Sequence, residues 1–342
     1  MKLQDELKET AQAMVAEGKG ILAIDESSPT CNKRFAELVI EQTDENRRAW
    51  RELLLTTPKV SEYISGAILY DETIRQSTAD GTPFTQYMVR HGILPGIKVD
   101  TGTKNLAGFP GEKVTEGLDG LRERLAEYKA LSARFAKWRA VITIGKGIPT
   151  TGCIQANAHA LARYAALCQE AGIVPIVEPE VLINGDHTID RCFEVTLETL
   201  DTVFAALEGQ RVLLEGAILK PSMVIAGLDC PQQASVAEVA QKTLECLLQT
   251  VPKNLAGVAF LSGGQGSEQA TATLNAMNAS GADLPWPLTF SYGRALQQLA
   301  LEAWLGKKEN AGAAQEQVFL RAKLNGAAAT GRYRNEMEKE AA

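Results

Sequence analysis

Residues 174–221 read VPIVEPEVLINGDHTIDRCFEVTLETLDTVFAALEGQRVLLEGAILKP, and this stretch decides the fold class. Its two ends contain short apolar runs, Val174–Val177 and Val212–Leu219, which are typical of buried strands. Between them, apolar side chains recur every three or four residues over Asp190–Leu207, the period of an amphipathic helix. A strand, a helix and a second strand predict a parallel unit, so we expect an α/β protein.

The same alternation of strand and helix continues along the whole chain. Six further apolar runs bring the expected strands to eight: Ile21–Ile24, Gly66–Leu69, Gly96–Val99, Ala140–Ile144, Val258–Leu261 and Leu288–Phe290. Eight such units favour a single (β/α)8 barrel, the TIM barrel, over an open sheet. Helical patterns at Leu3–Glu17 and Ala311–Asn325 predict extra N- and C-terminal helices. We expect one domain over residues 1–330 and a mobile polar tail over 331–342.

The composition narrows the classes of function. The 342 residues are 45% hydrophobic and 23% charged, the balance of an ordinary globular protein. A net charge of -7 without a basic block argues against a nucleic-acid partner. The absence of a signal region and of a long apolar run predicts a cytoplasmic protein without a membrane span. Six scattered cysteines and three separated histidines predict neither disulfides nor a metal site.

Lys220 directly follows one of the predicted strands, and Pro221 comes next. Burial disfavours the charged form of an amine, and the neutral form is the one that forms a Schiff base. We therefore interpret Lys220 as a candidate nucleophile. A lysine whose side chain reaches out of the strand end into solvent is the alternative.

Other charges also lie where predicted strands end, which is where barrels of this kind place their chemistry. Carboxylates or cations occur at four such ends: Asp25, Lys98, Glu178 with Glu180, and Lys220. Lys137 and Arg139 share one face of a strand because side chains alternate along it. We expect Lys137 to help keep Lys220 neutral while a glutamate transfers protons. A buried network of ion pairs without catalytic function is the alternative.

Two loops have the composition of phosphate sites. They follow the seventh and eighth strands and contain Ser262, Gly263 and Gly264, and Ser291, Gly293 and Arg294. Glycines let backbone N–H groups approach an anion, and barrels often bind phosphate at these two loops. A second basic patch, Lys33, Arg34 and Lys98, is predicted across the barrel mouth, although Lys33 and Arg34 also fit a solvated helix face. Together they suggest a bisphosphorylated small molecule.

Seven blocks of the sequence, between about Leu7 and about Tyr333, resemble the class I fructose-1,6-bisphosphate aldolases. They are Gly20–Ser27 (GILAIDES), Gly96–Asp100 (GIKVD), Phe135–Arg139 (FAKWR), Gly172–Glu180 (GIVPIVEPE), Leu219–Val224 (LKPSMV), Phe260–Gln265 (FLSGGQ) and Leu288–Leu296 (LTFSYGRAL). The resemblance implies a (β/α)8 barrel, usually a tetramer, that acts on phosphorylated ketoses and trioses in glycolysis and gluconeogenesis. It implies no metal and no other cofactor.

The resemblance also implies a role for each matching residue. Lys220 is similar to the Schiff-base lysine, Asp25 to the base that deprotonates the carbon 4 hydroxyl, and Glu178 to the general acid and base. Lys137 and Glu180 correspond to the charged network around them. The first phosphate site would contain Ser262, Gly263, Ser291, Gly293 and Arg294. The distal side would contain Arg34, Lys98 and Arg139, with Thr30 where the animal-type pattern has a serine.

The end of the sequence differs from the eukaryotic members, which typically end in a tyrosine that assists enamine protonation. This sequence ends in Glu340-Ala-Ala342, and its last tyrosine is Tyr333. We therefore expect another group to protonate the enamine, with slower or differently gated turnover. The substrate preference among fructose 1,6-bisphosphate, fructose 1-phosphate and sedoheptulose 1,7-bisphosphate stays open. A metal-dependent aldolase and a non-catalytic scaffold that binds sugar phosphates or a partner are the alternative functions.

Overall fold

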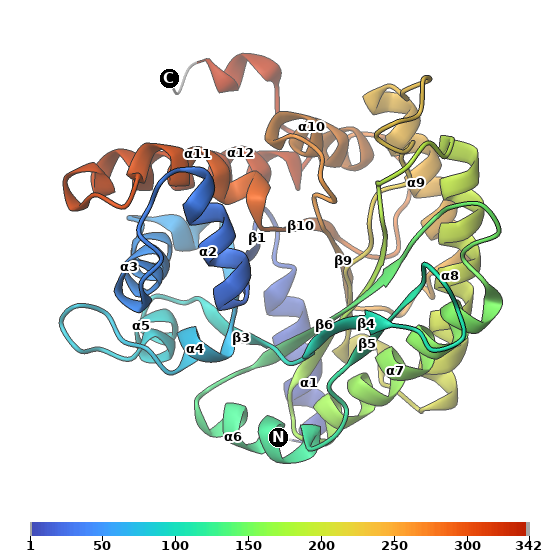
Figure 1. Ribbon diagram of the computed structural model, residues 1–342, viewed down its shortest axis with the longest axis horizontal. Coiled ribbons are helices and arrows are strands. Elements are labelled where there is room, and N and C mark those ends of the chain that lie inside the picture. Colours follow the sequence, from blue (N-terminus) through green and yellow to red (C-terminus); the bar gives the residue numbers. More distant parts are fainter. Residues whose placement is uncertain (1, 340–342) are drawn as a thin grey trace.

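The computed structural model describes residues 2–339, and its parallel strands close into a barrel (Figure 1). Around the barrel the order is β1, β10, β9, β8, β7, β6, β3, β2 and back to β1. The strands are β1 (Gly20–Ile24), β2 (Ile64–Leu69), β3 (Leu94–Lys98), β6 (Phe135–Ile142), β7 (Val174–Val181), β8 (Ile218–Leu219), β9 (Gly257–Phe260) and β10 (Leu288–Tyr292). This topology confirms the predicted (β/α)8 barrel.

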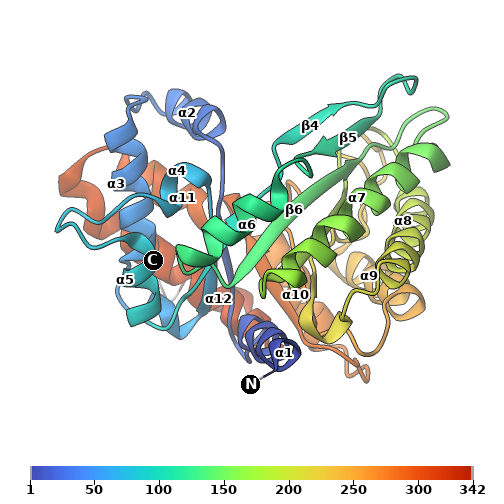
Figure 2. The same cartoon turned by 90° about the horizontal axis from the view of Figure 1, so that it is seen from below.

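Helices surround the barrel and also cover one of its ends. They are α1 (Leu3–Met14), α2 (Ser28–Glu37), α3 (Asp44–Leu55), α4 (Asp71–Ile74), α5 (Phe84–Arg90), α6 (Leu121–Ala130), α7 (Thr151–Glu170), α8 (Ile189–Gly209), α9 (Val236–Thr250), α10 (Ser267–Asn278), α11 (Arg294–Trp304) and α12 (Ala311–Ala328). Figure 2 shows α1 at one end of the barrel and a hairpin, β4 (Gly102–Asn105) with β5 (Lys113–Glu116), at the other. The helices α1 and α12 confirm the two extra helices.

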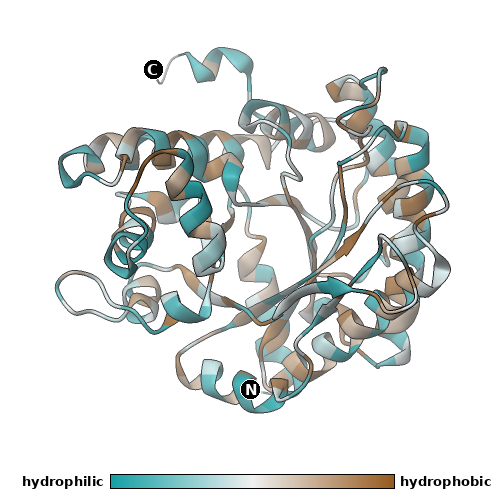
Figure 3. Ribbon diagram, in the orientation of Figure 1, coloured by the Kyte–Doolittle hydropathy of each residue, from teal (hydrophilic) through white to brown (hydrophobic). Residues whose placement is uncertain are grey.

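Two apolar cores hold these layers together. The larger core lies between the strands and the surrounding helices, and hydrophobic residues concentrate in the interior of the ribbon (Figure 3). The smaller core fills the barrel beneath α1, where Leu7 and Met14 pack with Phe135. A Cβ atom on Gly96 would lie 2.2 Å from the Phe135 ring, so this large ring depends on the adjacent glycine. The barrel is therefore closed and apolar below its functional end.

The strand expected over Val212–Leu219 is wrong for most of its length. Only Ile218–Leu219 is a strand, and Leu214–Gly216 forms a 3-10 turn instead. The side-chain amide of Gln169 donates to the carbonyls of Leu213 and Gly216, at 2.8 and 3.1 Å. These bonds satisfy backbone groups that a strand ladder would otherwise pair, and α1 packs against the turn.

Two other elements differ from the expectation. The strand β6 begins at Phe135, five residues before the predicted start at Ala140. The hairpin β4–β5 was not predicted, because its strands are four residues long and largely outside the core. Thr115 in β5 donates its hydroxyl to the Arg139 carbonyl at 2.7 Å, so the hairpin packs beside a predicted site residue.

The described part of the predicted tail makes contacts with the barrel domain. Tyr333 is buried, and Glu338 in the short helix Asn335–Glu338 forms an ion pair with Arg321 of α12 at 2.6 Å. The domain boundary and the mobility of 331–342 stay predictions. Within residues 2–339, no helix has both the length and the apolar character needed to cross a membrane.

Candidate active site

A cavity of about 300 Å³ opens at the carboxyl end of the barrel strands. All but one of the predicted site residues line it: Asp25, Thr30, Lys98, Lys137, Arg139, Glu178, Glu180, Lys220, Ser262, Gly263, Ser291, Gly293 and Arg294. The exception is Arg34. Parallel strands bring their ends to one rim, so residues almost 270 positions apart in the sequence meet in one cavity.

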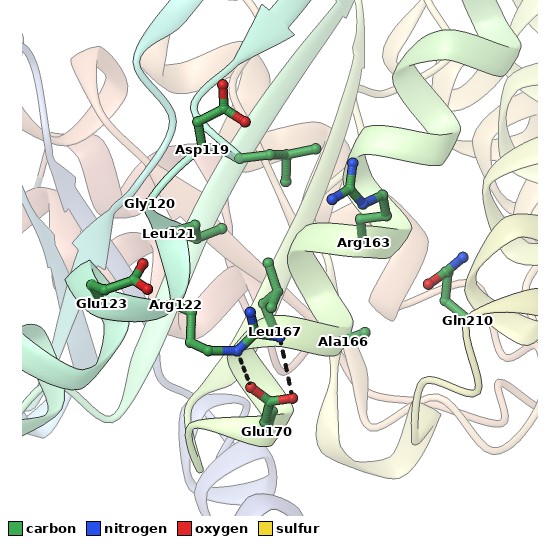
Figure 4. Close-up of a pocket in the computed structure, with 11 residues that line it drawn as sticks. Asp119, Gly120, Leu121, Arg122, Glu123, Arg163, Ala166, Leu167, Glu170 and Gln210 are labelled. Carbon is green, nitrogen blue, oxygen red and sulfur yellow. Dashed lines mark hydrogen bonds and ion pairs between the residues drawn. The ribbon is translucent and has the colours of Figure 1, made fainter.

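A second hollow, of about 460 Å³, lies between α6 and α7 and contains none of the predicted residues (Figure 4). Its lining mixes charges of both signs, and Arg122 is paired with Glu170 at 2.6 Å. Both of these side chains are more than half exposed, so the pair is a surface ion pair. The smaller cavity is the one with buried titratable groups, and it is therefore the candidate site.

Three buried side chains and the nearly buried Asp25 form a continuous chain of charges in the candidate site. The amine of Lys137 on β6 lies 2.7 Å from Asp25 Oδ2 and 3.2 Å from Glu178 Oε2. The other oxygen of Glu178, Oε1, lies 3.3 Å from the amine of Lys220. Each side chain comes from or directly follows a different strand, and all have 12% exposure or less. We call Asp25, Lys137, Glu178 and Lys220 the ionic quartet.

The electrostatics of the ionic quartet favour charged carboxylates. Burial acts to raise the pKa of Asp25, but the amines of Lys137 and Lys220 outweigh it and lower the pKa to about 2. Burial also acts to raise the pKa of Glu178. The positive charges of Lys137, Lys220 and Arg139 outweigh it and lower this pKa below its usual value. Burial acts to lower the pKa of Lys137, but Asp25 and Glu178 act more strongly and raise it. Lys137 is therefore the fixed positive charge of the cluster.

These shifts also link the ionic quartet to folding. The pKa of Asp25 in the folded chain, about 2, lies below the ordinary value of 3.8. Pairing of this carboxylate therefore stabilises the fold above about pH 3.8, and the contribution is lost as the pH falls toward 2.

Cations at the cavity rim are paired with carboxylates from the same or the neighbouring strand. The Lys98 amine lies 3.2 Å from Asp100 Oδ1, and Arg139 donates through Nε to Glu180. In addition, Asp100 accepts the backbone N–H of Arg139 at 3.3 Å. Side chains on β3, β6 and β7 are therefore tied together at the rim, on the side of the cavity opposite Ser291.

The loops after β9 and β10 contain donors that the protein leaves available. Gly263 and Gly264 both have positive φ, 58° and 88°, a conformation that glycine adopts at no steric cost and that turns backbone N–H groups toward a common point. The Ser291 hydroxyl is buried and has no hydrogen-bond partner among the described residues. Arg294 is exposed and opens α11, whose N-terminus also favours anions. An anion bound in the cavity would give the Ser291 hydroxyl an acceptor.

Arg34 lies outside the cavity because its guanidinium is engaged elsewhere. Its Nη1 atom lies 2.6 Å from Glu26 Oε1 and donates to the Gln297 side chain at 3.3 Å. Arg51 of α3 approaches the second oxygen of Glu26 at 3.0 Å. The structure therefore pairs Arg34 with Glu26, whose side chain lines the cavity.

Sequence reasoning missed four residues that line the cavity: Ala23, Glu26, Ser27 and Leu261. Two of them carried a readable signal, because Glu26 and Ser27 lie in the same acidic strand end as Asp25. The Ser27 hydroxyl lies 3.0 Å from that of Thr30, so two hydroxyls meet at the N-terminal turn of α2. Nothing in the local pattern distinguishes Ala23 or Leu261 from other strand residues.

Two further expectations concern histidines and the chain end. Within residues 2–339, no three His, Cys, Asp or Glu side chains are grouped as a metal site would require. Tyr333 donates its hydroxyl to Glu338 at 2.9 Å and does not line the cavity. The expectation drawn from Glu340-Ala-Ala342 falls on residues outside the described structure, so it stays a prediction.

Comparison with known proteins gives one consistent family. The family model described as "Fructose-bisphosphate aldolase class-I" matches residues 6–342. The probable fructose-bisphosphate aldolase class 1 of Xanthomonas campestris is 64% identical over 331 residues, which cover 96% of this chain and 99% of that protein. The fructose-bisphosphate aldolase of Drosophila melanogaster is 52% identical over 97% of this chain and 92% of that protein.

A solved structure agrees with the sequence relatives. The fructose-bisphosphate aldolase of Plasmodium falciparum, crystallised with TRAP and a small-molecule inhibitor, superimposes with a TM-score of 0.96. It shares 49% sequence identity, and the alignment covers 97% of this chain and 96% of that chain. Fold, identity and coverage lead to the same conclusion: the chain belongs to the class I fructose-bisphosphate aldolase family.

Proposed function

We propose that the candidate site cleaves fructose 1,6-bisphosphate reversibly into dihydroxyacetone phosphate and glyceraldehyde 3-phosphate through a Schiff base on Lys220. The observation that carries this proposal is the 3.3 Å separation between the buried Lys220 amine and Glu178 Oε1. A buried amine with a carboxylate at this distance has a partner for each proton transfer of Schiff-base formation.

In the first half of the reaction, the Lys220 amine attacks carbon 2 of the substrate and forms a carbinolamine. Glu178 accepts a proton from the Lys220 ammonium before the attack and returns it to the carbinolamine hydroxyl, which leaves as water, and an iminium remains. Asp25 then takes the proton of the carbon 4 hydroxyl. The electron pair of the bond between carbons 3 and 4 moves into the iminium, which leaves an enamine on Lys220 and releases glyceraldehyde 3-phosphate.

The second half restores the free amine. A proton adds to carbon 3 of the enamine, and the resulting iminium is hydrolysed by water to dihydroxyacetone phosphate and Lys220. Lys137 keeps its proton throughout both halves, because the carboxylates of Asp25 and Glu178 raise its pKa above the ordinary value of a lysine. Its constant positive charge stabilises Asp25 and Glu178 as anions between their proton transfers.

The phosphates divide between the two sides of the cavity. Ser262, Gly263, Ser291, Gly293 and Arg294 would hold the phosphate on carbon 1, since they include the buried Ser291 hydroxyl, which has no hydrogen-bond partner among residues 2–339. Lys98, Arg139 and Thr30 would face the distal phosphate or the sugar hydroxyls. Arg34 would support this side through Glu26 rather than through direct contact.

The wider setting follows from the family. Class I aldolases act in glycolysis, and we infer a cytoplasmic location because the spinach relative is named a cytoplasmic isozyme and an Arabidopsis thaliana relative cytosolic. The homotetramer implied by the resemblance stays a prediction, which sedimentation equilibrium of the purified chain would measure. A non-catalytic scaffold is the alternative, and intact positions for Lys220, Asp25 and Glu178 speak against it.

Trapping with borohydride tests the nucleophile. Dihydroxyacetone phosphate with borohydride should inactivate the protein irreversibly and attach one triose at Lys220, as peptide mass spectrometry would locate. Lys220→Ala should abolish the label, whereas Lys253→Ala, at an exposed lysine, should keep it. Chelators should leave turnover unchanged. A label at any other lysine would contradict the assignment.

Removal of the fixed positive charge tests the ionic quartet. In Lys137→Met, Asp25 and Glu178 lose the ammonium that lowers their pKa, so the acid limb of the cleavage profile should move to higher pH. We expect kcat to fall about 100-fold, the low end of general acid–base and electrostatic effects. Lys146→Met, at an exposed lysine in the loop after β6, serves as control. An unmoved acid limb with near-normal kcat would refute the role of Lys137.

Comparison of two sugars tests the division of the phosphate sites. Lys98→Ala should raise the KM for fructose 1,6-bisphosphate about tenfold while changing the KM for fructose 1-phosphate little, since a charge-assisted contact contributes about 1.5–3 kcal/mol. Arg294→Ala should raise the KM for both sugars. Steady-state kinetics of the two variants give the ratios. Equal effects of Lys98→Ala on both sugars would remove Lys98 from the distal site.

A further inference from the structure

Gln297 is a fully buried glutamine whose side-chain amide is almost completely engaged. It lies in the first turn of α11, three residues after Arg294, with an exposure of 0%. Its Nε2 atom donates to the Ala23 carbonyl at 2.6 Å and to Glu26 Oε1 at 3.0 Å. Its Oε1 atom accepts from Arg34 Nη1 at 3.3 Å. Both N–H groups therefore have acceptors, and a flipped amide would put its oxygen against two other oxygens.

Gln297 bonds to the β1 backbone just beyond the point where the pairing of β1 with β10 ends. Paired residues between β1 and β10 are Ile21 with Ser291 and Leu22 with Tyr292, so the ladder ends before Ala23. The pairing of β1 with β2, in contrast, extends to Ile24. On the β10 side, the end of β1 that leads into Asp25 is therefore held by the side chain of Gln297 rather than by a further ladder bond.

At its other end, Gln297 is fixed to the phosphate loop. The backbone N–H groups of Leu296 and Gln297 both bond to the Gly293 carbonyl, at 3.1 Å. The first turn of α11 is thus closed on Gly293, next to Arg294 and Ser291. One side chain consequently connects the loop that would bind the carbon 1 phosphate to the strand end that bears the proposed base.

Glu26 makes the connection rigid. Its carboxylate joins Arg34 of α2 at 2.6 Å, Arg51 of α3 at 3.0 Å and the amide of Gln297. All three partners are buried or nearly so, so the pairs are shielded from solvent and geometrically fixed. Since Glu26 directly follows Asp25 in the chain, the backbone on both sides of Asp25 is anchored, at Ala23 and at Glu26.

We propose that Gln297 is a positioning residue that sets the separation between the carbon 1 phosphate loop and Asp25. This inference rests on the proposed function, because it uses the roles given there to Asp25 and Arg294. A substrate held at the phosphate loop then presents its carbon 4 hydroxyl to Asp25. A displacement of about 1 Å in such a pair costs up to about 100-fold in rate.

Schiff-base formation and cleavage differ in whether they need Asp25. Formation of the Schiff base with dihydroxyacetone phosphate uses the phosphate loop, Lys220 and Glu178 but not Asp25, because the triose has no carbon 4. Cleavage of fructose 1,6-bisphosphate needs Asp25 in addition. Loosening the link at Gln297 should therefore slow cleavage and spare Schiff-base formation.

Gln297→Leu removes the amide and keeps a similar volume. We expect kcat for fructose 1,6-bisphosphate cleavage to fall about tenfold, while the rate of borohydride trapping with dihydroxyacetone phosphate stays within about twofold of the wild type. Gln298→Leu is the matched control, because among residues 2–339 this neighbouring side chain bonds only Glu302 on the same helix, at 2.7 Å. The control should leave both rates unchanged.

Gln297→Glu provides a second variant should the leucine variant not fold. It keeps the size and the acceptor toward Arg34 but loses the donors to Ala23 and Glu26, so the same split between cleavage and trapping is expected. Equal loss of both rates in a folded variant, or loss of neither, would overturn the proposal. Absence of cleavage and of trapping in the wild type would instead contradict the proposed function, so the two failures are distinguishable.

Discussion

The contact between the Lys137 ammonium and the two carboxylates of Asp25 and Glu178 is the interaction on which the rest of the site depends. Each of these charges would be costly to bury alone, and removal of one partner leaves the others uncompensated. In the barrel, side chains from or next to separate strands converge at one cavity, where each charge has a partner of opposite sign. The Lys220 amine lies beside the Glu178 carboxylate, which the Lys137 ammonium stabilises as an anion.

A contrast between the two sides of the cavity follows from the same principle. Rim cations such as Lys98 and Arg139 have carboxylate partners within the protein, whereas the buried Ser291 hydroxyl opposite them has none among residues 2–339. Buried polar groups without partners are rare in native structures. The loop side is therefore prepared for a ligand that supplies acceptors, and in the proposed function the carbon 1 phosphate does so.

Much of this arrangement could be predicted from the sequence, because it depends on periodicity and on strand ends. Alternation placed Lys137 and Arg139 on one face of β6, and the barrel rule then placed them beside Glu178. Tertiary contacts decided what could not be predicted. Arg34 has the local pattern of a phosphate ligand, but in the structure its guanidinium is paired with Glu26. The side chain of Gln169, 44 positions before Leu213, donates to the Leu213 carbonyl, and a turn forms there in place of the predicted strand.

The most direct test of the central claim measures the protonation of Lys137 itself. Heteronuclear NMR of the protein with labelled lysine side chains would follow the Lys137 resonance, assigned by its absence in Lys137→Met, from pH 6 to pH 10. The account predicts that Lys137 stays protonated throughout, because Asp25 and Glu178 raise its pKa above the ordinary value of a lysine. Deprotonation of Lys137 between pH 6 and pH 9 would contradict it.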